Sequence, residues 1–263
     1  MVKTECDLLE DKLRKKFNKG CTEYSLLADG DRILVALSGG KDSMALVRLL
    51  GGRAKIFKPH IQVEAAHVVM DNVPYVSDCD YLSDFCREAG VKFHVLHASF
   101  DEATDPRRTK CFLCAWNRRK ALFQFATANG FNKVALGHHQ DDILVTLLMN
   151  MSLEGAISTM PPMLRLEHYP VTIVRPLCLV NESLIAQWAE LFPVRRQNAS
   201  CPYETASLRS DYVRLFREME GLNPEVRFNL WKSMENIKSD MLPQKLCRNS
   251  LKSNKNGAVN KEK

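Results

Sequence analysis

A glycine-rich segment in the first fifth of the chain has the composition of a phosphate-binding loop. It stands between a short apolar run and a stretch with helical spacing, and it reads Ser38-Gly39-Gly40-Lys41-Asp42-Ser43. Glycines let the backbone approach an anion closely, and the amides at a helix N-terminus point at that anion. Lys41 would add positive charge, and Asp42 would hold a magnesium ion beside the phosphates. The spacing differs from that of a Walker A loop, and an ordinary strand-to-helix turn is the alternative interpretation.

A second group of polar residues follows a later apolar run, in the string Gly137-His138-His139-Gln140-Asp141-Asp142. A carboxylate here could hold magnesium, and a residue as small as Gly137 could admit a nucleotide. In the alternative interpretation, Asp141 caps the following helix and the two imidazoles are exposed. Because both strings follow predicted strands, we favour a shared ligand site.

Apolar runs alternate with segments of helical spacing along most of the chain. Runs typical of buried strands occupy 32–37, 61–69, 93–97, 133–136 and 171–174. Helical spacing occupies 8–17, 43–50, 75–89, 113–128, 141–151, 182–192 and 208–238. This alternation predicts an α/β fold with a parallel sheet flanked by helices, to which the last helical stretch makes a small C-terminal addition. The segments that follow the first, second and fourth strands should meet at the ligand-binding edge of the sheet.

Three of the nine cysteines stand in settings typical of metal ligands. Cys111 and Cys114 lie at the start of a predicted helix, and Cys201 precedes a proline. Thiolates at this spacing can point at one metal, and a Cys-Pro pair is a frequent setting for an iron–sulfur ligand. Three thiolates suit a cluster with one open iron. A zinc site, a redox-active dithiol and inert buried thiols are the alternatives.

Basic residues flank the cysteine pair on both sides. They are Arg107, Arg108, Lys110, Arg118, Arg119 and Lys120. The chain carries a formal charge of +6, but 245–263 holds six basic residues against one acid, so the rest of the chain is nearly neutral. The group is therefore a local patch that could bind RNA phosphates, or it is a solvated charged face. The tail is predicted to be disordered and could form a weak arm for nucleic acid.

The composition is that of an ordinary globular protein, with 45% apolar and 26% charged residues. The sequence contains no run of about 18 apolar residues and no apolar signal core, so we expect a cytoplasmic protein without a membrane partner. An odd cysteine count without such a signal argues against disulfides. We divide the chain into an N-terminal helical segment (1–30), an ATP-binding domain that includes the cysteine pair (31–200), a C-terminal segment with the last ligand cysteine and helices (201–244), and the tail (245–263).

The glycine-rich string resembles the PP-loop of the ATP pyrophosphatases, which split ATP into AMP and pyrophosphate. That superfamily has an adenine nucleotide alpha hydrolase-like fold and includes tRNA thiolation enzymes, lysidine synthetases, NAD synthetase and GMP synthetase. Taken together, the motifs resemble the tRNA 2-thiocytidine synthetase family over about 31–237. The strings that support the resemblance are the loop, the cysteine pair with Arg118-Arg119, 136–144, 160–162, 173–177 and Cys201.

This resemblance implies an enzyme that uses ATP and magnesium to install sulfur on cytidine 32 of the tRNA anticodon loop. It implies an oxygen-sensitive 4Fe-4S cluster on Cys111, Cys114 and Cys201, whose fourth iron is free to carry sulfide. It also implies a homodimer, and a sulfur donor such as a cysteine desulfurase would supply the reaction.

The implied reaction adenylates C2 of the cytidine and then replaces its oxygen with sulfur. Lys41, Asp42 and Asp142 would be the catalytic residues, and the two aspartates would bind Mg²⁺ or position water. Two positions depart from the pattern of related enzymes. Glu204 stands where better-known members have a second late cysteine, which indicates a divergent branch. Arg118 stands where archaeal-type thiolases have a lysine, and an arginine would act through its charge.

Two other functions fit parts of the pattern. An adenylating PP-loop enzyme could act on a small molecule or on another tRNA base, and the former would turn over ATP without RNA. A non-enzymatic iron–sulfur protein that binds RNA would release no pyrophosphate from ATP.

Overall fold

The structure of the protein, a computed structural model, describes residues 4–74, 77–101, 103, 107–192, 194–195 and 208–243. The predicted tail, the third ligand cysteine Cys201 and the divergent position Glu204 lie outside these residues. In the described part, no helix is both long and apolar enough to span a bilayer.

The predicted parallel sheet is confirmed. Its strands are β1 (Arg32–Ala36), β2 (Gln62–Met70), β3 (Lys92–Ala98), β4 (Lys133–Ala135), β5 (Met163–Arg165) and β6 (Thr172–Val174). The strand order is β3-β2-β1-β4-β6-β5, and all pairs are parallel except β5 with β6. Strand β5 was not predicted, because three partly exposed residues, Met-Leu-Arg, carry no alternating pattern.

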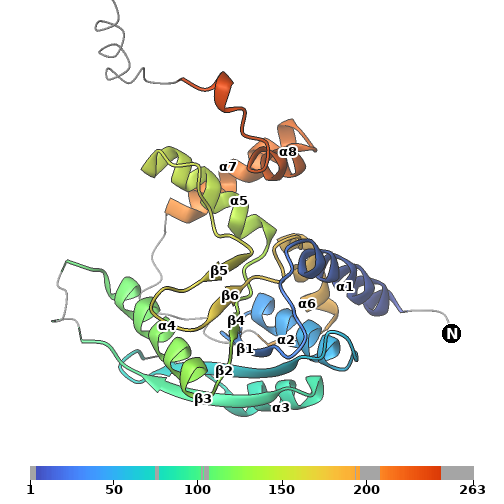
Figure 1. Ribbon diagram of the computed structural model, residues 1–263, viewed down its shortest axis with the longest axis vertical. Coiled ribbons are helices and arrows are strands. Elements are labelled where there is room, and N and C mark those ends of the chain that lie inside the picture. The colour runs from blue at the N-terminus through green and yellow to red at the C-terminus, as the bar shows by residue number, and fades with distance from the viewer. Residues whose placement is uncertain are drawn as a thin grey trace, which may run out of the picture.

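Helices cover both faces of the sheet (Figure 1). One face packs against α1 (Glu5–Glu23), α2 (Lys41–Ala54), α3 (Cys79–Ala89) and α6 (Glu182–Leu191). The other face packs against α4 (Lys110–Ala128). A parallel sheet buried on both sides needs apolar residues throughout each strand, which is why the central strands appear in the sequence as continuous apolar runs.

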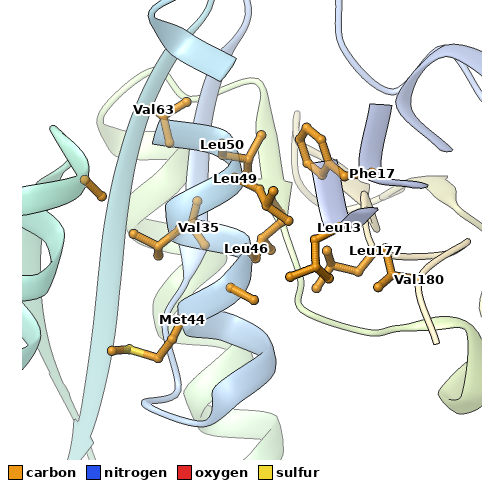
Figure 2. Packing of buried hydrophobic residues seen from close by; sticks show 14 of the residues in the cluster. Leu13, Phe17, Val35, Met44, Leu46, Leu49, Leu50, Val63, Leu177 and Val180 are labelled. Carbon is orange, nitrogen blue, oxygen red and sulfur yellow. The ribbon is translucent and has the colours of Figure 1, made fainter. Parts of the chain in front are cut away.

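The larger core joins the first helix to the sheet. Leu13 and Phe17 of α1 are 1% exposed and lie beside Leu46 and Leu50 of α2, as Figure 2 shows. Val35 of β1 lies beneath α2 in the same cluster. The N-terminal helix is therefore built into the main core, in contact with α6 as well.

A smaller cluster carries the C-terminal helices. It joins α5 (Gln140–Met149) to α7 (Leu208–Leu222) and α8 (Val226–Ser233), which lie together at the top of Figure 1. The predicted helical stretch 208–238 is thus confirmed as two helices. They are separated at Asn223 and Pro224, since proline cannot donate the next helical hydrogen bond.

The direction in which successive strands are added to the sheet reverses between β1 and β4. The chain proceeds from β1 through β2 to β3 on one side, and then returns to place β4 on the other side of β1. At such a switch point the loops after the two central strands diverge and leave a crevice, where α/β sheets bind ligands. The two polar strings found in the sequence follow β1 and β4, so they flank this crevice.

Candidate functional site

The glycine-rich segment forms the turn between β1 and α2. Gly39 has a φ of +84°, a conformation that glycine adopts without steric cost, and Gly40 is the N-cap residue of α2. The Ser38 hydroxyl donates to Ser43 Oγ at 3.1 Å, and the Ser43 hydroxyl donates to the Gly40 carbonyl at 2.9 Å. These bonds hold the loop closed around the first turn of α2, whose amides face the crevice end of the helix.

Gly137 is required by a close approach of two segments. A Cβ atom at this position would lie 3.1 Å from the Ser43 amide nitrogen and 3.2 Å from the Asp42 carbonyl carbon. The turn after β4 is therefore packed directly against the start of α2. This contact confirms that the loops after β1 and β4 meet at one edge of the sheet.

The loop after β2 belongs to the same edge. The buried ring of His67 donates from Nδ1 to the Leu37 carbonyl at 2.7 Å, and in the neutral ring Nε2 accepts from the Ser77 hydroxyl at 2.9 Å. His67 thereby ties the segment after β2 to the residue that precedes the glycine-rich loop. Burial lowers the pKa of His67 below its ordinary value, which keeps the ring neutral in this bridging role.

Lys41 lies between two carboxylates. Its Nζ is 3.3 Å from Asp42 Oδ1 and 3.1 Å from Glu182 Oε1 at the start of α6. Burial alone would lower the pKa of Lys41, but the two carboxylates outweigh it and raise the pKa above its ordinary value. The ammonium is therefore charged, and the acid that holds it, Glu182, belongs to a helix distant in sequence.

Asp42 has a buried carboxylate oxygen that accepts no hydrogen bond. Its Oδ1 has no hydrogen-bond donor among the described residues, although the Lys41 ammonium lies 3.3 Å away as an ion pair. Burial raises the pKa of Asp42 above its ordinary value, although Lys41 and His139 act in the opposite direction. A buried carboxylate oxygen without a hydrogen bond is costly unless a cation binds it, and carboxylate oxygens are the ligands that Mg²⁺ prefers. Asp42 thus fits the predicted magnesium ligand.

Asp142 is committed to contacts within the protein. Its Oδ2 accepts from the His139 amide at 3.0 Å, and the Asp142 amide donates to His139 Nδ1, a reciprocal cap on α5. Its Oδ1 pairs with the Arg209 guanidinium of α7 at 2.5 Å. His139 is buried and is the N-cap residue, so the alternative interpretation with Asp141 as the cap and both imidazoles exposed is wrong.

Asp141 connects the site to the last helices. It accepts from the Glu182 amide at 2.8 Å and from Arg227 Nη2 of α8 at 2.8 Å. Burial alone would raise the pKa of Asp141, but these hydrogen bonds lower it below its ordinary value. Arg227 also pairs with Glu220 at 2.7 Å, so its guanidinium joins α8 to α7 and α5, and the Asp141 carboxylate extends the network to α6.

A cavity of about 520 Å³ opens between these elements. His139, Asp142 and Glu182 line it from α5 and α6, and Arg209, Arg217 and other residues line it from the C-terminal helices. The volume lies within the range of pockets that hold small molecules and cofactors. Its walls combine carboxylates and guanidinium groups, and residues 38–43 of the glycine-rich loop are not among its lining residues.

His138 stands apart from this acid-rich wall. Its Nδ1 accepts a hydrogen bond from Arg175 Nε at 3.2 Å, and Arg175 also donates to the Pro161 carbonyl at 2.5 Å. Burial and the Arg175 charge lower the pKa of His138 to about 4. The imidazole is therefore neutral at physiological pH, and its remaining proton is on Nε2.

The cysteine pair lies on the first turn of α4, apart in sequence from the two segments that flank the crevice. The helix begins at Lys110, about one turn earlier than predicted, because the Thr109 hydroxyl caps it by accepting from the Phe112 amide. Cys111 is exposed, whereas Cys114 is buried. Among the described residues no group of three potential metal ligands is assembled, and the third predicted ligand, Cys201, lies outside them. Two thiols three residues apart on the first turn of a helix, one exposed and one buried, fit two ligands of a cluster that a third thiolate would complete.

The predicted basic patch is distributed over two surfaces. Arg107, Arg108, Lys110, Arg119 and Lys120 are exposed around the outer side of α4. Arg118 is half-buried, and its charge lowers the pKa of His67. Arg118 therefore points toward the sheet and the segments that surround the glycine-rich loop.

Sequence reasoning missed Glu182, Arg209 and Arg227. Each is an ordinary charged residue at the start or on a face of a predicted helix, and no local pattern distinguishes it. Only the docking of α7 and α8 on α5, and of α6 against α1 and α2, brings their charges to the crevice.

Comparisons with known proteins agree with this architecture. A PP-loop domain model matches residues 9–210, most of the chain. A tRNA-cytidine(32) 2-sulfurtransferase of Bdellovibrio bacteriovorus is 35% identical, over 88% of this chain and 90% of its own. One from Geobacter sulfurreducens is 32% identical, over 90% of this chain and 95% of its own. This chain belongs to the PP-loop family, in its tRNA-cytidine(32) 2-sulfurtransferase group. The segment 38–43 is accordingly called the PP-loop below.

A solved structure of a tRNA thiolase shares the fold. The U34-tRNA thiolase NcsA from Methanococcus maripaludis, solved with its 4Fe-4S cluster, superposes with a TM-score of 0.73 at 24% identity. The match covers 91% of this chain and 83% of the archaeal one. It confirms the predicted sheet and flanking helices.

Proposed function

We propose that this protein is an ATP-dependent tRNA sulfurtransferase that converts a cytidine, at position 32 of the anticodon loop, to 2-thiocytidine. The observation that carries the proposal is the combination of a PP-loop at the β1–β4 crevice with a cysteine pair at the start of α4. The PP-loop supports activation of the base by ATP, and the cysteine pair supports delivery of sulfur. The curated relatives, which match along nearly their whole length, are named for this reaction.

The PP-loop residues would bind and orient ATP. The amides at the start of α2 and the charge of Lys41 would hold the phosphates, with Ser38 and Ser43 shaping the loop. The C2 oxygen of cytosine would attack the α-phosphorus and release pyrophosphate, which turns a poor leaving group into AMP. Gly137, which packs against the first turn of α2, would keep the β4 turn close to the loop that holds the phosphates.

The buried Oδ1 of Asp42 is the position from which Mg²⁺ would be held beside the phosphates. When bound, the ion would neutralise charge that develops on the leaving pyrophosphate. Asp142 is already paired with Arg209, so it would act by fixing His139 and α7, or would bind the metal only after this pair opens.

Cys111 and Cys114 would hold a 4Fe-4S cluster together with Cys201. The cluster would supply the sulfur atom that replaces the activated oxygen at C2. The exposed position of Cys111 suits a centre that must meet a macromolecular substrate. The basic residues of α4, at the same end of that helix, would contact the phosphates of the anticodon stem.

The remaining parts of the proposal concern partners and place. A cysteine desulfurase would provide sulfur, the protein would act as a homodimer, and it would work in the cytoplasm, where thiols stay reduced. Sedimentation of the anaerobically purified protein tests the dimer directly.

The decisive experiment is mass spectrometry of tRNA nucleosides from cells with and without this gene. We expect 2-thiocytidine to disappear in the deletion and to return when the wild-type chain is expressed. It should not return with Cys201→Ser, which should also lose the visible absorbance of the anaerobic cluster. An unchanged nucleoside profile contradicts the proposal.

Pyrophosphate release by the purified protein separates the remaining alternatives. Release that depends on tRNA supports thiolation, and release that needs no RNA indicates activation of a small molecule. The absence of release, with the fold and cluster intact, would indicate an RNA-binding protein without catalysis.

A further inference from the structure

The outer face of α4 carries two exposed aromatic rings beside the cysteine pair. Phe112 and Trp116 are 39% and 49% exposed. They are four residues apart, so they lie one above the other on one side of the helix. The buried side of α4, which includes Leu113 and Phe123, packs on the sheet. Two neighbouring large rings on the solvent side of a helix form an exposed apolar patch, and such patches mark interaction sites more than single exposed rings do.

Each ring is accompanied by a cation. The Arg108 guanidinium lies 4.6 Å from the centre of the Phe112 ring, and the Lys120 ammonium lies 5.2 Å from the centre of the Trp116 ring. Two adjacent aromatic side chains with a cation at each end thus form a single strip, which we call the α4 strip, made of Arg108, Phe112, Trp116 and Lys120. Cys111 is exposed at the same end of the helix.

The surroundings of the α4 strip select a polyanion as its partner. Helix α4 contains Lys110, Arg118, Arg119 and Lys120 and not one acidic residue. The sequence has no Asp or Glu from Arg107 to Gln140. An apolar strip that served to bind a protein or a second copy of this chain would normally have a less one-sided charge at its rim.

We propose that the α4 strip is a stacking platform for unpaired bases of the RNA substrate, with Trp116 as its principal contact. The inference rests on the proposed function, which supplies an RNA with an exposed loop. Aromatic rings between cations are the arrangement with which proteins bind single-stranded nucleic acid, since the cations track phosphates and the rings stack on bases. Stacking beside Cys111 would hold the anticodon loop open near the sulfur-delivering centre.

The test uses two RNAs and the full-length protein with its cluster. One RNA is the anticodon stem–loop, and the other has the same stem and phosphates but abasic sites in its loop. We expect Trp116→Ala to weaken binding of the first RNA about tenfold, the usual effect of losing one stacked base. Binding of the abasic RNA should not change. Equal losses for both RNAs, or none, would overturn the proposal.

Trp116→Lys separates stacking from charge. This variant removes the ring but adds a cation to the strip, so it should bind the stem–loop more weakly if stacking matters. Tighter binding would mean that the strip acts through charge alone, which contradicts the proposal. Phe57→Ala is the matched control, because Phe57 is 82% exposed on the loop before β2, at the opposite edge of the sheet.

Intrinsic fluorescence provides an independent readout. Of the three tryptophans, Trp188 is 1% exposed, and the indole of Trp231 donates to Tyr24 Oη at 3.0 Å. Trp116 should therefore dominate any quenching on addition of the stem–loop. Quenching that depends on protein concentration without RNA would identify the strip as a contact between copies and overturn the proposal.

The two proposals fail in different ways. If the wild-type protein binds and thiolates tRNA while the Trp116 variants behave like wild type, only the stacking platform is wrong. If the wild-type protein neither binds the stem–loop nor thiolates tRNA, the proposed function is wrong, and the stacking platform falls with it.

Discussion

The ammonium of Lys41 in the PP-loop lies 3.1 Å from the carboxylate of Glu182, a residue 141 positions later in the chain. Glu182 also lies 3.9 Å from Arg217 of α7. The charge that we propose meets the phosphates is therefore paired with an acid from α6. ATP must displace this acid, or share the lysine with it, to reach the loop.

Glu182→Gln should strengthen ATP binding, because it removes the carboxylate that competes with phosphate for Lys41. Glu182 is more than one-third exposed, so we expect a modest two- to fivefold decrease in the KM for ATP, equivalent to about 0.5–1 kcal/mol. The rate of pyrophosphate release at varied ATP concentrations measures this KM. Glu190→Gln, an exposed acid on the same helix, should leave the KM unchanged. A higher KM for ATP in Glu182→Gln would show that Glu182 supports Lys41 instead of competing for it.

Asp42→Asn should abolish magnesium-dependent turnover, with a loss on the order of 100-fold or more. It should also stabilise the protein near neutral pH. The folded-state pKa of Asp42 is raised by burial, so ionising this group costs stability as pH rises above the ordinary aspartate value of about 3.9. The gain in Tm should thus vanish below that pH. Thermal unfolding at several pH values and a Mg²⁺ titration are the measurements, and an unchanged Mg²⁺ dependence would contradict the assignment.

Gly137→Ala should disturb the PP-loop, because its Cβ would lie 3.1 Å from the Ser43 amide nitrogen. We expect a cost of about 1–3 kcal/mol in unfolding free energy and a marked loss of pyrophosphate release. Gly52→Ala is the matched control in α2, where no atom lies within 4 Å of the added Cβ. It should stabilise the helix by up to about 1 kcal/mol. Normal activity of Gly137→Ala would show that the β4 turn can move away from α2.

Arg227→Gln should destabilise the protein by about 1–3 kcal/mol at pH 7, because it leaves Asp141 and Glu220 without their shared guanidinium. The pKa of Asp141 is lowered in the folded protein. The stability that ionised Asp141 contributes is therefore complete above the ordinary aspartate pKa. It is lost as the pH falls through the lowered pKa of Asp141 in the folded protein.

Urea denaturation of wild type and Arg227→Gln at pH 7 and at pH 3 measures this difference, which should shrink at the lower pH. Arg214→Gln is the matched control, because it breaks an exposed ion pair between Arg214 and Asp211 within α7. It should lower the free energy of unfolding by less than about 0.5 kcal/mol. Equal costs for the two variants would mean that the Arg227 network contributes no more than a surface ion pair.

The sequence alone determined the features that depend on near neighbours along the chain. The apolar runs defined the central strands, because a strand buried on both faces needs apolar residues at every position. The PP-loop was recognisable because its glycines, lysine and serines act within one turn of backbone. The cysteine pair was recognisable for the same reason.

Tertiary structure alone decided which charges meet at the crevice. Glu182 reaches Lys41 across 141 positions, Arg227 reaches Asp141 across 86, and Arg209 reaches Asp142 across 67. No periodicity records such pairs, because they depend on how α7 and α8 dock on α5 and on how α6 packs against α1 and α2. The three-residue edge strand β5 was missed since it exists only through its pairing with β6. The local sequence thus specified the reactive groups, and long-range packing set their charge balance.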